Sequence, residues 1–482
     1  MAKSRLLLVP DNMVVKRLQF ENPWWQTGDI DADFKKYEKR HYFYLFYSLV
    51  TQTSIRRAVV LMGPRRVGKT VMMQHAISDL LKIKKVRENK ICLISLENPL
   101  FQNISLQELF GRAMTTIGNE DPKGWFVFFD EIQYMNDWEV ELKVMVDSYP
   151  HTKFVVSGSA AAALKLASSE SGAGRFTDFM LPPLTFSEYI DMTKNKHLIV
   201  TSSINWNNKP ISYYSTNNII RLNELFVDYI NFGGYPEVIF HDQIKQNMGR
   251  YIKSDIIDKV LLQDLPSLYG IKNVQELNRF FTMLVFNTGN ELSLQSLSQG
   301  SGINKETIVK YLTYLEAAFL IKQIYRIDNA GKKFERQTYA KIYLTNPSLR
   351  SALFSPLNEN DDAIGHMVET AVYSQSLHRD SFKYYYARWH NGEVDMVHID
   401  PGTLKPSWAL EIKWSDNASV NNSDLNSILH FCKNNKLEEC IMTTKTVTDS
   451  RLVNGIYVNL LPSAVYTYNA ACNSIVQKRK IL

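Results

Sequence analysis

The chain has 482 residues but few cysteines, and their positions exclude two common uses of this residue. They form no C-x-x-C pair and no spacing typical of zinc ligands, so neither a disulfide framework nor a zinc ribbon is expected. The cysteines are Cys92, Cys432, Cys440 and Cys472. Reduced thiols are typical of the cytosol, and we therefore expect a cytoplasmic protein.

Long hydrophobic runs are also missing. The first residues, MAKSRLLLVP, contain a short apolar run without a small-residue cleavage site, which does not fit a secretory signal. No stretch approaches the roughly 20 apolar residues of a membrane span, so we expect no membrane partner. A large charge of one sign is missing too. The formal net charge of +6 permits a nucleic-acid partner without requiring one.

The first 200 residues do contain an alternation of apolar strands and helical patterns. Strand-like runs recur at RAVVLM, KICLISLE, GWFVFFDE and TKFVVSGSA. This alternation predicts an α/β fold, with a parallel sheet covered by helices on both faces. We expect this domain over residues 51–205. An N-terminal extension over residues 1–50, with ENPWWQTGD as a loop, is expected before it.

The segment GPRRVGKT fits the pattern G-x-x-x-x-G-K-[ST] of a phosphate-binding P-loop. It follows an apolar strand and opens a helical pattern, a context that a chance glycine turn rarely has. Backbone N–H groups and the helix N-terminus would favour bound phosphate. Lys69 would reach the β- and γ-phosphates of ATP, and Thr70 would hold Mg²⁺. The residues predicted to bind the nucleotide are Gly63, Pro64, Arg65, Arg66, Val67, Gly68, Lys69 and Thr70.

Polar residues end the last two of these apolar strands, GWFVFFDE and TKFVVSGSA. Asp130 would bind Mg²⁺, and Glu131 would orient or deprotonate the attacking water. Ser157 and Ser159 end TKFVVSGSA, where a polar residue can sense the γ-phosphate or can simply cap a helix. Arg175 in GAGRF is a candidate arginine finger for the nucleotide of a neighbouring subunit, which would require a homo-oligomer.

The segments GPRRVGKT, FFDEIQ, VVSGSA, GR and LPPLTFSEY follow one another between about Arg56 and Tyr189. In this order the region resembles an AAA-type ATPase. The later GGYPE and the C-terminal half resemble a large prokaryotic family that couples such an ATPase to a restriction-endonuclease-like domain. The resemblance implies ATP and Mg²⁺ as cofactors and ATP hydrolysis as an activity.

A helix–turn–helix pattern followed by two strands predicts a winged helix over residues 291–350. A mostly helical segment over residues 206–290 precedes it. The second helix would begin at Lys305, and the strands are expected at about 320–327 and 339–344. The alternative is a helical packing module, or a protein contact, whose lysines face water. The basic residues that could contact DNA phosphates are Lys305, Lys310, Lys332, Lys333 and Arg336.

The segment GEVDMVHIDPGTLKPSWALEIKW, residues 392–414, is typical of a β-hairpin. If Ile399 pairs with Ser407, Asp395 lies opposite Glu411, and Lys413 shares their face. Two opposed carboxylates repel unless a cation such as Mg²⁺ lies between them. The alternative is a hairpin with a solvated charged face. The other face is expected in a core and carries Val394, Met396, Leu410, Ile412 and Trp414.

The elements expected over residues 360–482 have the order helix, three strands, helix, strand. This αβββαβ order resembles the PD-(D/E)XK nuclease core. Carried over, Asp395 and the Glu411-Ile412-Lys413 unit match the family motif, and Glu369 matches its helical acid. Asp395 and Glu411 would hold the metal. The proline of the motif is absent, because Val394 precedes the aspartate, which leaves room for a fold that kept its acids and lost its activity.

Together these patterns predict an ATP-hydrolysing, Mg²⁺-dependent ATPase that acts on DNA. Its parts are a P-loop α/β domain, a helical and winged-helix middle, and a nuclease-like C-terminal domain that cleaves phosphodiester bonds. The alternative is a nucleotide-gated regulatory or interaction protein whose nuclease-like domain binds DNA or protein without cutting. The sequence leaves the oligomeric state and the preferred DNA structure open.

Overall fold

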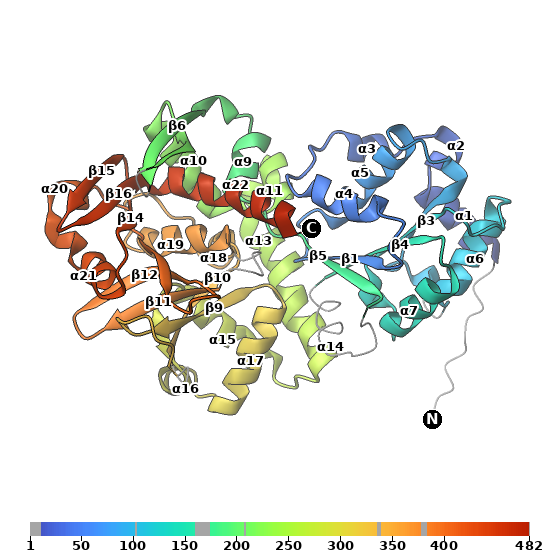
Figure 1. The fold of residues 1–482 in the computed structure, drawn as a ribbon. Helices are drawn as coiled ribbons and strands as arrows, with labels where there is room; N and C mark the ends of the chain where they lie inside the picture. The colour runs from blue at the N-terminus through green and yellow to red at the C-terminus, as the bar shows by residue number, and fades with distance from the viewer. Residues whose placement is uncertain are drawn as a thin grey trace. The chain divides into compact units, whose positions relative to one another are not determined.

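The structure is a computed structural model that describes residues 11–101, 104–159, 174–206, 209–334, 339–376 and 383–481. Its contacts divide the chain into two compact units, Met1–Leu181 and Pro182–Leu482. Figure 1 labels their elements. Arg336 lies outside the described residues. No helix in the described ranges combines the length and the hydropathy needed to cross a membrane.

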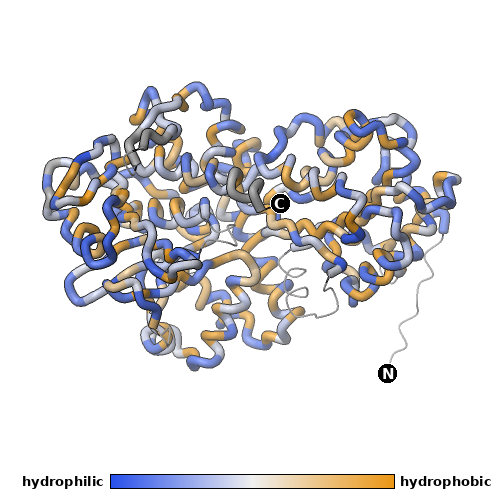
Figure 2. Tube along the Cα trace, in the orientation of Figure 1, coloured by the Kyte–Doolittle hydropathy of each residue, from blue (hydrophilic) through white to orange (hydrophobic). Residues whose placement is uncertain are grey.

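The first unit contains a five-stranded sheet in the order β2-β3-β4-β1-β5, and all neighbouring strands are parallel. This confirms the predicted parallel sheet. Hydrophobic stretches of the chain, orange in Figure 2, include its interior strands. Such strands are apolar along their whole length because helices cover both faces of the sheet. The strands are β1 (Ala58–Met62), β2 (Ile91–Ser95), β3 (Phe126–Asp130), β4 (Lys153–Gly158) and β5 (Phe176–Met180).

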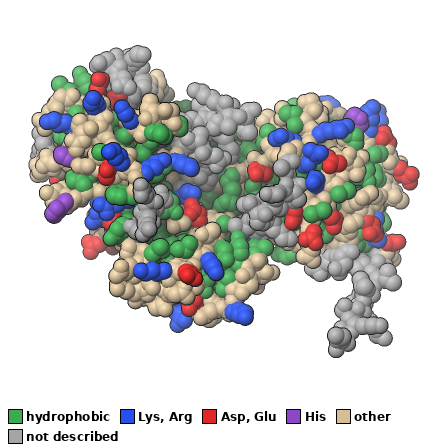
Figure 3. All heavy atoms as spheres, turned by 60° about the horizontal axis from the view of Figure 1, so that its bottom comes forward, with side chains coloured by type: hydrophobic (Ala, Val, Ile, Leu, Met, Phe, Trp, Pro, Cys, Tyr) green, Lys and Arg blue, Asp and Glu red, His purple; other side chains and the backbone are tan. Residues whose placement is uncertain are grey.

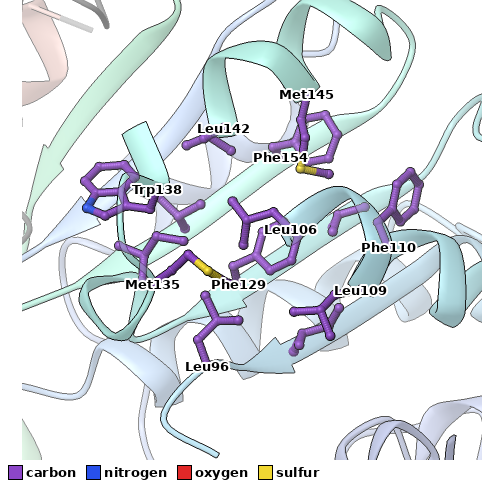
Figure 4. Close-up of a cluster of buried hydrophobic side chains, with 14 of the residues drawn as sticks. Leu96, Leu106, Leu109, Phe110, Phe129, Met135, Trp138, Leu142, Met145 and Phe154 are labelled. Atoms are coloured by element: carbon purple, nitrogen blue, oxygen red, sulfur yellow. The ribbon is translucent and has the colours of Figure 1, made fainter. Parts of the chain in front are cut away.

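Helices α6 and α7 bury their apolar sides on one face of this sheet. Leu109 and Phe110 of α6 and Leu142 of α7 pack with Phe129 and Phe154 of the sheet, as Figure 4 shows. The Ser105 side chain caps α6 by accepting from the Glu108 N–H. The helices of this unit are α1 (Asp11–Glu21), α2 (Trp24–Thr27), α3 (Ala32–Lys35), α4 (Phe43–Thr51), α5 (Lys69–Lys82), α6 (Leu106–Thr116) and α7 (Trp138–Ser148).

The segment ENPWW is not the loop that the sequence predicted, because it ends α1, begins α2 and covers the edge strand β2. The Asn22 amide donates to the Leu93 carbonyl at 2.8 Å and accepts from the Leu93 N–H at 2.6 Å. The indole N–H groups of Trp24 and Trp25 both donate to the Ile91 carbonyl. These side chains use backbone groups that an open sheet edge would leave unpaired.

The second unit is built on a nine-stranded mixed sheet in the order β15-β16-β14-β13-β12-β11-β9-β10-β8. Strands β9 and β11 pair in parallel and join the segment predicted as a winged helix to the segment predicted as nuclease-like. The strands are β8 (Glu291–Ser293), β9 (Ile321–Ile327), β10 (Tyr339–Leu344), β11 (Tyr384–Trp389), β12 (Gly392–Ile399), β13 (Pro406–Glu411), β14 (Glu439–Thr444), β15 (Asp449–Val453) and β16 (Ile456–Pro462).

Helices of the second unit pack around this sheet, beside a separate hairpin of β6 (Ile199–Trp206) and β7 (Lys209–Thr216). Helix α9, expected at the end of the P-loop domain, packs into the core of the second unit. The helices are α9 (Phe186–Met192), α10 (Ile219–Phe232), α11 (Pro236–Phe240), α12 (Asp242–Gln246), α13 (Met248–Ile252), α14 (Leu265–Tyr269), α15 (Val274–Phe286), α16 (Leu294–Ser301), α17 (Lys305–Ala317), α18 (Ser348–Leu353), α19 (Ile364–Ser374), α20 (Asn417–Val420), α21 (Asn426–Asn435) and α22 (Ser463–Ile481).

The expected helix–turn–helix lies in α16 and α17, and the two expected strands follow as β9 and β10. Gly302 follows the last residue of α16, and its positive φ of 75° makes the tight turn possible. Asn304 then caps α17 by accepting from the Thr307 N–H. Farther along, α19, β11, β12, β13, α21 and β14 follow in the predicted order of helix, three strands, helix and strand.

A β-bulge in β12 changes which face each residue of the predicted hairpin occupies. Tyr385 pairs with Val397 and Ala387 pairs with Val394, so Asp395 and Met396 together lie opposite Tyr386. Met396 therefore packs in the core cluster beside α19, whereas Val394 packs in the cluster on the other face. The prediction that Val394 shares a face with Met396 was wrong, because the extra residue interrupts the alternation. A second irregularity pairs Ile399 with Pro406 instead of Ser407.

Candidate functional site

The segment Gly63–Thr70 forms the turn between the end of β1 and the start of α5. A Cβ atom added at Gly63 would lie 2.2 Å from the Leu181 carbonyl oxygen, so this position needs glycine. Gly68 has a φ of 92° and immediately precedes the first residue of α5. The two glycines therefore allow the loop to close tightly over the N-terminus of α5, where the helix field favours an anion.

The side chains of the loop are held by neighbouring residues. Lys69 is only 4% exposed, and its ammonium donates to the Gly63 carbonyl at 3.2 Å and the Pro64 carbonyl at 2.9 Å. The buried Arg40 donates to the Val67 carbonyl at 2.7 Å. Arg65 is half-buried and hydrogen-bonds to Tyr134, and Arg66 is exposed with a φ of 64°. Lys69 thus lies along the loop that it is predicted to serve.

The predicted magnesium ligands meet at the start of α5. The Thr70 hydroxyl donates to Asp130 Oδ2 at 2.7 Å, and the Ser157 hydroxyl donates to Asp130 Oδ1. Burial and then the charge of Glu131 raise the pKa of Asp130, while Ser157, Thr70 and Lys69 act in the opposite direction. A hydroxyl and a carboxylate at this separation are hard oxygen donors, and they fit Mg²⁺ bound beside a nucleotide phosphate.

Glu131 is positioned by two polar partners at the ends of β3 and β4. Its backbone N–H donates to Ser157 Oγ at 3.1 Å, and its carboxylate accepts from the Gln133 amide. Gln133 Oε1 in turn accepts from the Ser159 N–H at 3.1 Å. The buried Ser159 hydroxyl has no hydrogen-bond partner among the described residues. Ser157 is therefore engaged in holding both acids, and Ser159 has the hydroxyl that could bind a ligand.

Arg175 lies at the opposite end of the sheet from the phosphate loop. Its carbonyl accepts from the Ala58 N–H at the start of β1, whereas Gly63 follows the end of this strand. Its guanidinium forms an ion pair with Asp147 at 2.6 Å. A five-residue strand spans roughly 16 Å, so Arg175 does not belong to the phosphate site of its own chain.

The acids predicted for the C-terminal site are brought together in the second unit. Met396 pairs with Leu410, which places Asp395 and Glu411 at the next positions of β12 and β13. Lys413 contacts Glu411 Oε1 at 2.7 Å, and the Ile412 N–H donates to Asp395 Oδ2 at 2.9 Å. Glu369 lies on α19 and accepts from Tyr343 at 3.0 Å.

Burial and neighbouring charges shift the pKa values of the acids in this cluster in opposite directions. Burial and the charge of Asp395 raise the pKa of Glu369 and the pKa of Glu411 to about 8. Burial also acts to raise the pKa of Asp395, but Lys341 and Lys413 outweigh it and lower the pKa below its ordinary value. The two lysines therefore favour the charged form of Asp395, whereas burial favours the neutral forms of Glu369 and Glu411.

Lys341 of β10 is a member of this cluster that the sequence reading did not include. Its ammonium lies 3.1 Å from Asp395 Oδ1 and 3.6 Å from Glu369 Oε2, and it also forms an ion pair with Glu393. Arg388 reaches the other oxygen of Glu393 at 3.5 Å. Within the described ranges, no group of three or more His, Cys, Asp and Glu side chains is arranged to hold a metal ion.

Sequence reasoning missed Arg40, Gln133, Glu393 and Lys341. Gln133 could have been predicted from the sequence, because it is the last residue of the FFDEIQ segment. The signal for Lys341 is a lysine inside the otherwise apolar and aromatic run YAKIYL, where a buried charge needs a partner. Arg40 precedes the phosphate loop by more than twenty residues and has no local pattern that links it to the loop.

Comparisons with known proteins agree with the reading of the first unit. Residues 55–190 match the model of a family described as an AAA domain. This match, the parallel sheet and the geometry of the phosphate loop support an AAA-type P-loop ATPase domain in this part of the chain. Residues 223–361 match a family described as a domain of unknown function, DUF8612.

Relatives along most of the chain are uncharacterized proteins. The protein MJ1544 of Methanocaldococcus jannaschii is 25% identical over 346 residues, which are 70% of this chain and 71% of that protein. An uncharacterized protein of Haemophilus influenzae is 23% identical over 405 residues, which are 83% of this chain and 92% of that protein. The chain is therefore similar to these proteins over both units.

Solved structures give weaker likenesses. The Aeropyrum pernix ORC1 protein in complex with DNA has a TM-score of 0.30 at 11% identity, covering 72% of this chain and 94% of that chain. The Aeropyrum pernix ORC2 protein has a TM-score of 0.36 at 10% identity, covering 63% of this chain and 88% of that chain. At these TM-scores the likeness carries no inference about fold or function.

Proposed function

We propose that the first unit binds ATP with Mg²⁺ and hydrolyses it. The observation that carries this proposal is the contact between the Thr70 hydroxyl and the Asp130 carboxylate at 2.7 Å, directly behind the phosphate loop. It joins the two oxygen donors that a nucleotide-bound Mg²⁺ needs, and Glu131 is the next residue of the chain. The match of residues 55–190 to an AAA domain supports the same function.

Each residue of the site has a role in this proposal. Lys69 would bind the β- and γ-phosphates, and Thr70 and Asp130 would hold Mg²⁺, which offsets negative charge on the phosphates when it is bound. Glu131 would orient the attacking water and accept its proton. Ser157 and Gln133 would keep the two acids in position, because they already hydrogen-bond to them. Ser159 would bind the γ-phosphate through its hydroxyl.

Arg175 would act only between subunits in this proposal. It lies at the sheet end opposite to the phosphate loop, so the nucleotide that it reaches would belong to a neighbouring copy of the chain. A homo-oligomer would therefore be needed for full activity. Mixing Arg175→Ala subunits with Lys69→Ala subunits tests this role, because turnover should return only if each copy supplies what the other lacks.

Calorimetry and a turnover assay test the proposed ATPase. Wild-type protein should bind ATP in the presence of Mg²⁺ and release phosphate, whereas Lys69→Ala should lose binding. Glu131→Gln should keep binding and lose turnover. Lys82→Ala is the matched control, because Lys82 lies at the other end of α5, 52% exposed and paired with Asp29. Unchanged turnover in both Lys69→Ala and Glu131→Gln would refute the site.

A second candidate function is DNA binding by the helix–turn–helix of the second unit. Lys305 and Lys310 are exposed on α17, and Lys332 and Lys333 are exposed in the segment after β9. Figure 3 shows basic and acidic side chains intermixed on the visible face, and the proposal rests on these four lysines. Contacts of this kind bind phosphates without reading the base sequence.

The sequence also predicts that Asp395, Glu411 and Lys413 of the second unit cleave phosphodiester bonds. The alternative is a nucleotide-gated protein whose C-terminal segment binds DNA or protein without cutting. The contacts of Asp395 favour the alternative, because Lys341 and Ile412 already donate to its two oxygens. Incubation of the protein with labelled linear, branched or single-stranded DNA and Mg²⁺ or Mn²⁺ separates the two functions. Cleavage by the wild type that is lost in Asp395→Ala and Lys413→Ala would establish the nuclease.

A further inference from the structure

Lys341 lies where its single positive charge meets three carboxylates. Its side chain is 5% exposed, and the acids come from two elements, Glu369 from α19 and Glu393 and Asp395 from β12. Burial by itself lowers the pKa of Lys341, but the charges of Asp395, Glu369 and Glu393 outweigh it and raise the pKa above its ordinary value. The three contacts place the ammonium at the centre of the acids.

The fold brings Lys341 to this position through sheet pairing and the bulge in β12. Strand β10 pairs with β9, β9 with β11, and β11 with β12, so three strand pairings separate Lys341 from Asp395. The bulge places Asp395 opposite Tyr386, and the Lys341 ammonium lies 5.6 Å from the centre of the Tyr386 ring. The extra residue lets Asp395 and Met396 both lie opposite Tyr386, between Val394 and Val397 of the other face.

A divalent cation does not fit the oxygens of this cluster while Lys341 is present. Asp395 Oδ1 accepts from Lys341 at 3.1 Å, and Asp395 Oδ2 accepts from the Ile412 N–H at 2.9 Å. Glu411 Oε1 is paired with Lys413 at 2.7 Å. Mg²⁺ prefers a near-octahedral set of oxygens at about 2.1 Å, and a second cation so close to the ammonium would be repelled strongly in this buried site.

One atom of the cluster shows where a cation could bind if the ammonium were removed. Glu411 Oε2 is buried and has no hydrogen-bond partner in the part of the chain that the structure describes. The carboxylates of Asp395 and Glu369 would lose a partner together with Lys341. Removal of one side chain would thus leave several buried carboxylate oxygens that need a positive charge.

We propose that the Lys341 ammonium is the resident cation of this acidic cluster and takes the place of a divalent metal ion. It ties β10, which follows the helix–turn–helix, to the acids of α19 and β12. A chain that lacks this ammonium gains a divalent-cation site at Asp395. The inference rests on the part of the proposed function in which the second unit binds without cutting, and it is independent of ATP hydrolysis.

Mn²⁺ binding without nucleotide, measured by electron paramagnetic resonance, tests this proposal. The full chain carries Asp130→Asn in every sample, so that the phosphate site of the first unit contributes no binding. This parent should show no saturable Mn²⁺ binding, and adding Lys341→Met should create one saturable Mn²⁺ site per chain. Adding Asp395→Asn to the Lys341→Met protein should abolish the new site.

Lys153→Met is the matched control, because Lys153 is also buried, at 6% exposure, but donates to the carbonyls of Gln52 and Arg57. Its loss should create no Mn²⁺ site. Mn²⁺ binding by the parent that disappears with Asp395→Asn would overturn the proposal, and so would a folded Lys341→Met protein that gains no binding. If Lys341→Met does not fold, the parent and its Asp395→Asn form still decide, since equal absence of binding supports the resident cation.

Discussion

The two units each bury a lysine inside a sheet, and the partners of these lysines differ. Lys153 in the first unit is 6% exposed and donates to two backbone carbonyls, while Lys341 in the second unit is 4% exposed and contacts three carboxylates. Burial lowers the pKa of Lys153 to about 8. The acids around Lys341 reverse the same effect and raise its pKa. The charge of a buried lysine therefore depends on what it touches more than on how deeply it lies.

Lys69 extends this comparison to the phosphate loop. It is as buried as Lys341 and donates to the Gly63 and Pro64 carbonyls, which carry no formal charge. Lys69 thus donates to carbonyls of the phosphate loop, whereas Lys341 forms ion pairs with carboxylates that balance its charge. The difference supports ligand binding at the first site and a structural ion pair at the second.

The largest effect should come from removing the buried ammonium of the second unit. Lys341→Met leaves the acids without their cation, and we expect the free energy of unfolding to fall by about 3–5 kcal/mol. Lys153→Met should cost less, about 1–3 kcal/mol, because only hydrogen bonds to carbonyls are lost. Urea unfolding of both variants measures the difference, and equal losses would remove the distinction between the two lysines.

The acid of the phosphate site should matter for turnover. Asp130→Asn removes a carboxylate that contacts Thr70 and Ser157, and we expect ATP turnover to fall on the order of 100-fold. Phosphate release at saturating ATP and Mg²⁺ measures it. Glu108→Gln is the control, since Glu108 is an exposed acid on α6 that pairs with Arg112. Equal turnover in the two variants would place the magnesium ligand elsewhere.

The pH dependence of stability should show the lowered pKa of Lys153. Because the folded pKa of Lys153, about 8, lies below the ordinary value of 10.5, the unfolded chain binds more protons between these values. Stability should therefore rise with pH in this window, by up to about 1.4 kcal/mol per pH unit from this group. Thermal unfolding at pH 8 and 9.5 should show a smaller rise in Lys153→Met. The same slope in both proteins would contradict the lowered pKa.

The smallest expected effect concerns the lysines that are exposed on α17. Lys305→Ala and Lys310→Ala should each weaken DNA binding similarly for all sequences and reduce the slope of log affinity against log salt by about 1. Fluorescence anisotropy at several salt concentrations measures this slope. Lys322→Ala on β9, whose lysine pairs with Glu316 at 2.6 Å, serves as the control. An unchanged slope in all three variants would contradict DNA binding by these lysines and would favour a helix–turn–helix that serves only packing.

Local motifs were the most predictable part of the molecule. The phosphate loop needs eight consecutive residues between a strand and a helix, and the structure has this arrangement. The positions of β9, β10, α17 and β11–β14 were also close to expectation, because apolar periodicity and turn residues specify each element by itself. The face occupied by Val394 was wrong, since a one-residue bulge reverses alternation and leaves no clear trace in the local pattern.

The sequence by itself determined the phosphate loop, the acid pair after β3 and the order of elements along the chain, because each depends on residues that are neighbours in sequence. The tertiary structure alone decided that Lys341 joins Asp395, Glu369 and Glu393. That meeting requires β10 to pair with β9, β9 with β11, and β11 with β12. Contacts between strands far apart in sequence follow from the packing of whole sheets, which no short pattern records.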